Sequence, residues 1–139
     1  MAQEILVKEV LSADEINAGE QLLRLLDDST QLKVIAAYWI FDPDVGAWRL
    51  VFVSPQVETK GPLRVYMQIF QLLNLDSRLS FLIPSDRISI EGPNYTSYKE
   101  LLSAVNSKKE LAGVRLNRLV VGGQVIDLYV YRLPARTGP

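Results

Sequence analysis

Two adjacent glycines near the carboxyl end, Gly122 and Gly123, constrain the fold of this chain more than any other feature. They separate two runs rich in β-branched and aromatic residues, at positions 114–121 and 124–133. A two-residue connection of this kind closes as a type I′ turn, in which both residues need positive φ, and glycine takes that conformation at no steric cost. The pattern therefore predicts a β-hairpin in which Val121 lies opposite Gln124.

The register of this hairpin follows from its turn. Counting outward from the glycines, Arg118 should lie opposite Asp127, and Leu116 opposite Tyr129. An Arg–Asp pair across an exposed sheet face contributes roughly 0.2–1 kcal/mol. The predicted register thus places two opposite charges, Arg118 and Asp127, beside each other, which supports it.

Capping, turn and periodicity signals predict the remaining elements. Ser12 and Glu15 have the spacing of a capping box, which indicates a helix over residues 13–28. A second helix should begin at Gly61 and Pro62, and apolar residues at 98, 101, 102 and 105 mark a third. Residues 33–41 and 48–53 read as a second hairpin around the loop 42–46, and short strands are expected at 87–90 and 5–10.

Together these elements predict one α+β domain over residues 1–133. Hairpins force antiparallel pairing, so we expect a mainly antiparallel sheet of about five strands, built from two hairpins plus one strand. About three helices should pack mostly on one face of that sheet. Residues 134–139 are expected to form a disordered C-terminal tail.

The chain of 139 residues contains no histidine and no cysteine. Ser-His-Asp and Cys-His catalysis, structural zinc, thiol redox chemistry and disulfides all need one of these residues. We therefore expect no metal site and no cofactor, and we favour a protein that is not an enzyme. No apolar run approaches the roughly 20 residues that cross a bilayer, and the first residues lack the features of a signal peptide, so we expect a cytoplasmic protein without membrane association.

A candidate ligand site lies where the chain passes from a strand into the second helix. A helix N-terminus offers unpaired backbone N–H donors and a positive dipole, which suit an anion. The residues that could build such a site are Arg49, Ser54, Lys60, Gly61 and Arg132. The segment lacks the order of a Walker loop, and a Gly-Pro pair also serves simply to start a helix. One hypothesis is therefore an anion- or phosphate-binding module, or a small enzyme that uses these cations.

The run at residues 33–41 is apolar on both sides, which favours a role in assembly. Alternation predicts one side with Ile35, Trp39 and Phe41, and another with Val34, Tyr38 and Ile40. Since a few helices of modest length readily cover only one face of such a sheet, a partner should cover the other. We therefore predict a homodimer or a stable protein partner, with the sheet or its edge in contact.

Tyr129 and Tyr131 share a sheet face with Leu116 and Arg118 in the predicted register. Aromatic rings on an exposed face can contact a partner protein, and beside arginine they can stack on bases. The net charge of −1 and the absence of an RNP-like motif argue against nucleic acid. We assign both tyrosines to the partner interface and keep a nucleic-acid-binding accessory protein as a further alternative.

Several segments resemble a group of short uncharacterised bacterial proteins. The likeness lies in residues 41–51, Ser54-Pro55, Lys60-Gly61-Pro62, Tyr66 and residues 127–133. The resemblance implies a bacterial origin and a stand-alone domain, and it brings no activity, cofactor or catalytic residue. Our first hypothesis is accordingly a non-catalytic protein-binding or assembly module of a bacterial cytoplasmic system.

Overall fold

The computed structural model describes residues 10–136. In chain order these residues form α1 (Ala13–Ser29), β1 (Ala36–Asp42), β2 (Ala47–Val53), α2 (Gln56–Lys60), α3 (Pro62–Leu75), α4 (Ser77–Leu82), the 3₁₀ helix η1 (Ser85–Arg87), β3 (Ile88–Glu91), α5 (Thr96–Val105), β4 (Val114–Val121) and β5 (Gln124–Arg132). The α+β class and the sheet of five strands agree with the prediction.

The described residues contain five α-helices, where about three were expected, because the short helices α2 and α4 flank α3, which is the predicted second helix. Gly61, with φ of 89°, separates α2 from α3. Asp76 separates α3 from α4, and its side chain accepts hydrogen bonds from the backbone nitrogens of Arg78 and Leu79. A glycine with positive φ and a capping carboxylate each end one helix and start the next.

The sheet is mixed, with the strand order β3-β2-β1-β5-β4. Both hairpins are antiparallel, and so is the pairing of β1 with β5. The pairing of β2 with β3 is parallel. The expectation of a mainly antiparallel sheet is thus only roughly right, because helices α2 to α4 carry the chain back so that β3 runs in the same direction as β2.

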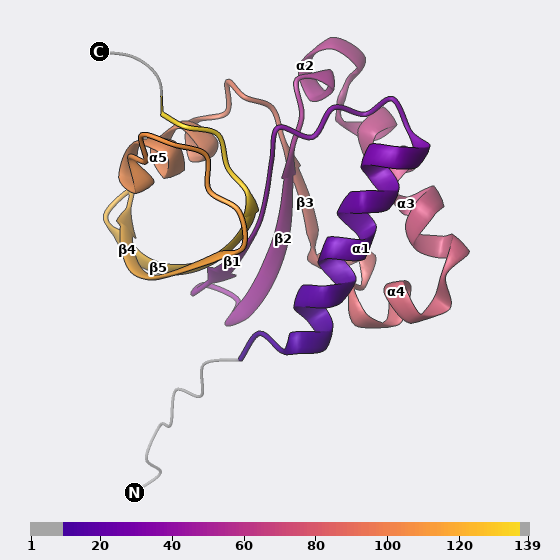
Figure 1. Cartoon of the computed structure of the whole chain (residues 1–139), viewed down its shortest axis with the longest axis horizontal. Helices are drawn as coiled ribbons and strands as arrows, with labels where there is room; N and C mark the ends of the chain where they lie inside the picture. The colour runs from indigo at the N-terminus through magenta and orange to yellow at the C-terminus, as the bar shows by residue number, and fades with distance from the viewer. Residues whose placement is uncertain (1–9, 137–139) are drawn as a thin grey trace, which may run out of the picture.

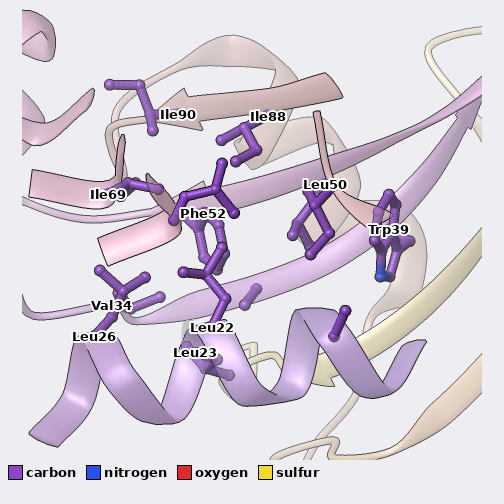
Figure 2. Packing of buried hydrophobic residues seen from close by; sticks show 14 of the residues in the cluster. Leu22, Leu23, Leu26, Val34, Trp39, Leu50, Phe52, Ile69, Ile88 and Ile90 are labelled. Carbon is purple, nitrogen blue, oxygen red and sulfur yellow. The ribbon is translucent and has the colours of Figure 1, made fainter. Parts of the chain in front are cut away.

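Helices α1, α3 and α4 lie on one side of the sheet (Figure 1). Their apolar residues form a core with the residues of β1, β2 and β3 that point the same way. In Figure 2, Leu22 of α1 points toward Phe52 of β2, and Trp39 and Leu50 continue the same layer. The stripe predicted for the first helix is confirmed, since Leu22, Leu23 and Leu26 are buried.

The opposite face of the sheet curls around α5 (Figure 1). Tyr98 and Leu101 of α5 pack there with Val51 of β2 and with Leu128 and Val130 of β5. Both faces of β1 are therefore covered from within the chain. The expectation that helices would leave one sheet face for a partner is wrong, because α5 and the curled β4–β5 hairpin cover it.

At the start of β1, the side chains do not alternate between the two sheet faces as predicted. Val34 belongs to the core on the α1 side together with Ala37 and Trp39, whereas Ile35 and Ala36 both pack on the α5 side. Regular alternation holds only from Ala36, where the strand begins. Ile35 consequently lies on the side opposite Trp39, contrary to the prediction.

The final hairpin closes as expected at its turn. Gly122 and Gly123 have φ of 56° and 83°. Val121 pairs with Gln124, and Leu119 with Ile126. Two positive φ values are the requirement of a type I′ turn, so this part of the prediction is confirmed.

Beyond Leu119 a β-bulge shifts the register by one residue. Arg118 has a positive φ of 58°, and its backbone nitrogen donates a hydrogen bond of 2.8 Å to the Asp127 carboxylate. Leu116 therefore pairs with Leu128 instead of Tyr129. Since a shift of one residue exchanges the two faces of a strand, Tyr129 faces away from Leu116, contrary to the prediction.

The described part of the expected tail packs against the end of α5. The backbone nitrogen of Arg136 donates to the carbonyl of Ser107 at 2.8 Å, and its guanidinium donates to the Asn106 side chain at 3.1 Å. Residues 137–139 lie outside the described residues. So does the strand expected at 5–10, apart from Val10, which is exposed and belongs to no strand.

Candidate functional site

A cavity of about 260 Å³ opens on the α5 side of the sheet. Strands β1, β2 and β3, helix α5 and the tip of the β4–β5 hairpin line it. The polar lining consists of Tyr38, Arg49, Ser89, Glu91, Ser97, Glu100 and Gln124, and the apolar lining includes Ile40, Val51, Leu101, Val121 and Ile126. We call this space the α5 cavity.

Strand alternation brings these side chains to the same face. Successive residues of a strand point to opposite faces, so Arg49 and Val51 face α5 while Leu50 enters the α1 core. In the same way Ser89 and Glu91 of β3 face the α5 cavity. The polar residues of β2 and β3 are thus positioned by buried strands and do not depend on a loop.

Tyr38 is the most deeply buried polar residue of the α5 cavity, with 2% of its surface exposed. Its hydroxyl makes no hydrogen bond within residues 10–136 and is not fully enclosed, so it opens into the cavity. Burial raises the pKa of Tyr38 well above its ordinary value, and the nearby Glu91 carboxyl adds to that rise. The hydroxyl is therefore protonated at neutral pH and can both donate and accept a hydrogen bond.

Arg49 brings a positive charge to the α5 cavity. Its Nη1 donates a hydrogen bond of 3.0 Å to the Ser89 hydroxyl, and its Nε lies 4.0 Å from the Asp42 carboxylate. A guanidinium carries five N–H donors, so most of them are left for water or a ligand.

Glu91 and Glu100 bring carboxyl groups to the α5 cavity. The Ser97 hydroxyl donates to Oε1 of Glu91 at 2.9 Å. Burial raises the pKa of Glu91 above its ordinary value, although the hydrogen bond from Ser97 opposes the rise. Glu100 reaches the hairpin tip, since a Cβ at Gly122 would lie 2.8 Å from its carboxylate oxygen. The hairpin tip therefore closes one side of the cavity against α5.

Arg132 lies in a different hollow, between α1 and β5. Its guanidinium donates to both carboxylate oxygens of Asp27, at 3.2 and 2.6 Å, and to the carbonyl of Val34 at 2.8 Å. These bonds tie the end of α1 to the sheet. The prediction that Arg132 shares a ligand site with Arg49 and Lys60 finds no support, because the three residues line separate hollows.

Ser54, Lys60 and Gly61 surround the short helix α2. Ser54 is fully buried, and its hydroxyl accepts a hydrogen bond from the backbone nitrogen of Gln56 at 3.2 Å. Lys60 lines a shallow hollow on the flank of α3 with Gln68. Ser54 and Gly61 thus have structural roles, in starting α2 and in turning the chain into α3.

The predicted interface residues are mostly part of the α1 core. Trp39 is fully buried, and its indole Nε1 donates to the Tyr131 hydroxyl at 2.8 Å. That hydroxyl in turn donates to the carbonyl of Ile16 in α1. Phe41 packs edge-on against the Trp48 ring. These side chains therefore present no open sheet face to a partner.

Tyr129 is half-buried, and its ring meets that of Tyr131 edge-on at 5.2 Å between centroids. Both tyrosines line the hollow that also holds Arg132. The neighbouring cations in that hollow are already paired, Arg132 with Asp27 and Arg24 with Glu20. The arrangement does not offer a free stacking platform of aromatic rings and arginine.

Of the residues in the α5 cavity, only Arg49 was among the predicted ligand residues. Ser89 and Glu91 carry a signal in the sequence, since they are the polar positions of a short strand whose alternate residues, Ile88 and Ile90, are apolar. Tyr38 carries none, because a tyrosine within an apolar run is typical of a core residue.

Within residues 10–136, no cluster of three or more acidic residues lies close enough together to hold a metal ion. In the same part of the chain, no helix combines the length and the apolar character needed to span a bilayer. No protein-family model, no curated protein and no solved structure matches the chain.

Proposed function

We propose that this domain is a non-catalytic binding module that holds a small polar molecule in the α5 cavity. The observation that carries the proposal is the Tyr38 side chain, whose ring is buried while its hydroxyl has no hydrogen-bond partner among the described residues and opens into the cavity. In the cavity this hydroxyl is free to donate one hydrogen bond and to accept another. A ligand with a polar group at this position can replace the water that would otherwise bond to the hydroxyl.

The chemistry of the cavity favours binding over catalysis. Apolar walls with a few convergent polar groups are typical of small-molecule sites. The chain has no histidine or cysteine, and the raised pKa of Tyr38 makes its hydroxyl a poor nucleophile and a poor base. The groups present can orient a ligand by hydrogen bonds and charge.

Replacing Tyr38 with Phe should separate stability from binding. Without ligand, we expect the free energy of unfolding to change by less than about 1 kcal/mol, because the hydroxyl makes no hydrogen bond within the described residues. Denaturant titration measures this change, and Tyr98→Phe is the matched control because Tyr98 is buried on the same side but does not line the cavity. A fall of more than about 1 kcal/mol for Tyr38→Phe alone would mean that the hydroxyl has a structural partner, and would contradict the proposal.

Binding is tested by thermal shift with a panel of amino acids, monosaccharides, dicarboxylates and small amines. At least one compound should raise the melting temperature of the wild type, since a ligand that binds only the folded state stabilises it. Ser97→Trp should abolish this shift by filling the cavity mouth, whereas Ser103→Trp, on an exposed position of α5 outside the cavity, should preserve it. Equal shifts in both variants would place the binding elsewhere.

An assembly module is the second candidate, supported by a different surface from the one predicted. Large apolar side chains are exposed on the consecutive helices α3 and α4: Leu63, Met67, Leu75 and Phe81. Large exposed apolar side chains on consecutive helices are candidates for a protein–protein contact. A homodimer through these helices would bury on the order of 800 Å² per chain.

Light scattering tests the assembly candidate. We expect a dimer mass at micromolar concentration for the wild type and a monomer mass for Met67→Lys and Phe81→Lys, because a buried unpaired charge opposes association. Val120→Lys, at an exposed apolar position on the β4–β5 hairpin, is the control and should leave the dimer intact. A monomer mass for the wild type would remove this candidate.

A further inference from the structure

The strand register orders the charges along the α5 cavity. Tyr38 lies opposite Val51, and Val51 lies opposite Ser89, so these residues form the middle level of the floor. The Arg49 guanidinium reaches this level, since its Nη1 contacts the Ser89 hydroxyl at 3.0 Å. Glu91 lies two residues farther along β3, which is about 7 Å at the rise of a strand. A positive end and an acidic end thus face one cavity at a separation that a small molecule can bridge.

Both ends keep free bonding capacity within the described residues. The guanidinium of Arg49 makes one hydrogen bond, to Ser89, and lies 4.0 Å from Asp42, beyond hydrogen-bond distance. The Glu91 carboxyl accepts one side-chain hydrogen bond, at Oε1 from Ser97. Between the two ends, the Tyr38 hydroxyl opens into the cavity and has no described partner.

The size and the wall of the cavity limit the ligand further. A volume of about 260 Å³ is below the roughly 300–1,000 Å³ of drug-sized sites, so the ligand is small. Ile40, Val51 and Leu101 offer an apolar surface for a short aliphatic group.

The balance of charge disfavours a phosphate or a dicarboxylate. Arg49 is the one cation among the lining residues, whereas Glu91 and Glu100 both present carboxyl groups. A ligand with two negative charges would meet like charge without compensation, and that juxtaposition is unfavourable at close range. A ligand with one group of each sign satisfies both ends.

On the basis of the proposed function, we infer that the α5 cavity binds a zwitterion of amino-acid size. Its carboxylate pairs with Arg49, its ammonium group pairs with Glu91, and the Tyr38 hydroxyl bonds to the polar atoms between them. The aliphatic part of the ligand contacts Ile40 and Leu101. Charge-assisted hydrogen bonds at both ends supply the selectivity.

The test compares one amino acid with its two singly charged analogues. The protein amino acids are first ranked by thermal shift, and the best of them is titrated calorimetrically beside the amine that lacks its carboxylate and the acid that lacks its ammonium group. We expect wild-type protein to bind the amino acid at least about tenfold more tightly than either analogue, since each analogue loses the charge-assisted hydrogen bonds at one end.

Two variants test which residue binds each charged group of the ligand. Arg49→Gln should bind the amino acid no better than the amine, and Glu91→Gln should bind it no better than the acid. The controls are Lys99→Gln and Glu110→Gln, which change exposed charges outside the cavity and should keep the wild-type preference.

The outcomes distinguish the ligand class from the proposed function. The inference of a zwitterionic ligand fails if an analogue binds as tightly as the amino acid. It also fails if another compound of the panel binds instead and Ser97→Trp abolishes that binding. In both cases the proposed binding function stands. If no amino acid and no other compound of the panel shifts the melting temperature, both fail. A preference for the amino acid that persists in both Arg49→Gln and Glu91→Gln would place the recognition at a different site and overturn the inference.

Discussion

Replacing Arg87 with Met should lower the free energy of unfolding by about 2 kcal/mol, between the loss of an exposed ion pair and that of a fully buried one. Arg87 joins the end of η1 to α1, because its Nη1 pairs with the Glu15 carboxylate at 2.7 Å. Its Nε also donates to the carbonyl of Trp48 at 3.0 Å, and the guanidinium lies 5.4 Å from the centre of the Trp39 ring. Met keeps most of the stem volume, so the loss reports on the polar and cation–π contacts.

Arg24→Met is the matched control. Arg24 also pairs with a carboxylate of α1 at 2.7 Å, that of Glu20, but its side chain is 72% exposed where that of Arg87 is 20% exposed. An exposed pair of this spacing contributes about 0.3–0.5 kcal/mol. Denaturant titration of both variants decides the matter, and equal losses would show that burial does not strengthen the Arg87 pair.

The effect of Arg87→Met should depend on pH. Burial alone would raise the pKa of Glu15, but hydrogen bonds from the Ser12 backbone and from Arg87 outweigh it and lower the pKa below the ordinary value of 4.5. A carboxyl with a lowered folded-state pKa stabilises the fold above its unfolded pKa, and that contribution is lost as the pH falls through the folded value. The difference between wild type and Arg87→Met should therefore shrink when titrations are repeated well below pH 4.5.

Gly19→Ala is expected to destabilise the protein by about 1–3 kcal/mol through overpacking. This is opposite to the usual effect, since Ala is favoured over Gly by about 1 kcal/mol within a helix. The reason is the Tyr131 ring, because a Cβ at Gly19 would lie 2.8 Å from its Cζ atom. The ring cannot withdraw without losing the hydrogen bonds that its hydroxyl makes with Trp39 and Ile16.

A second background tests whether Tyr131 is the cause. In Tyr131→Leu protein, Gly19→Ala should become neutral or stabilising, because the obstructing ring atoms are gone and only helix propensity remains. Asn17→Ala, on the exposed side of α1, should be neutral or stabilising in both backgrounds. Thermal and denaturant unfolding measure all of these variants. An equal loss for Gly19→Ala with Tyr or Leu at position 131 would refute the steric explanation.

The local elements of this fold could be predicted because their causes lie within a few residues. The Ser12–Glu15 capping box starts α1 where expected, with hydrogen bonds of 3.0 and 3.1 Å. Gly122 and Gly123 form the predicted turn, since the φ values that the turn needs are a property of the two residues themselves. The apolar stripe of α5 is also as predicted, with Tyr98 and Leu101 buried.

The bulge at Arg118 marks where this local reasoning ends. The turn sets the register for the first pairs, but Arg118 takes a positive φ and its backbone bonds to the Asp127 side chain. This single residue moves Leu116 to the α5 side, whereas the regular alternation of β5 keeps Tyr129 on the α1 side. The position of this bulge could not be predicted from the sequence pattern, because the bulge depends on how β4 curls around α5.

The candidate site depended on the tertiary structure even more strongly. The sequence determined the long helices, the two hairpins and their turns, and the absence of histidine and cysteine determined which chemistry they lack. Only the tertiary structure decided that β3 pairs parallel with β2 and that α5 covers the second sheet face, and these two facts bring Arg49, Glu91 and Tyr38 into one cavity. The physical reason is the distance along the sequence between the residues that interact. Caps and turns are stabilised by neighbours in the chain, whereas strand pairing and face selection depend on the burial of apolar surface among residues far apart in the sequence.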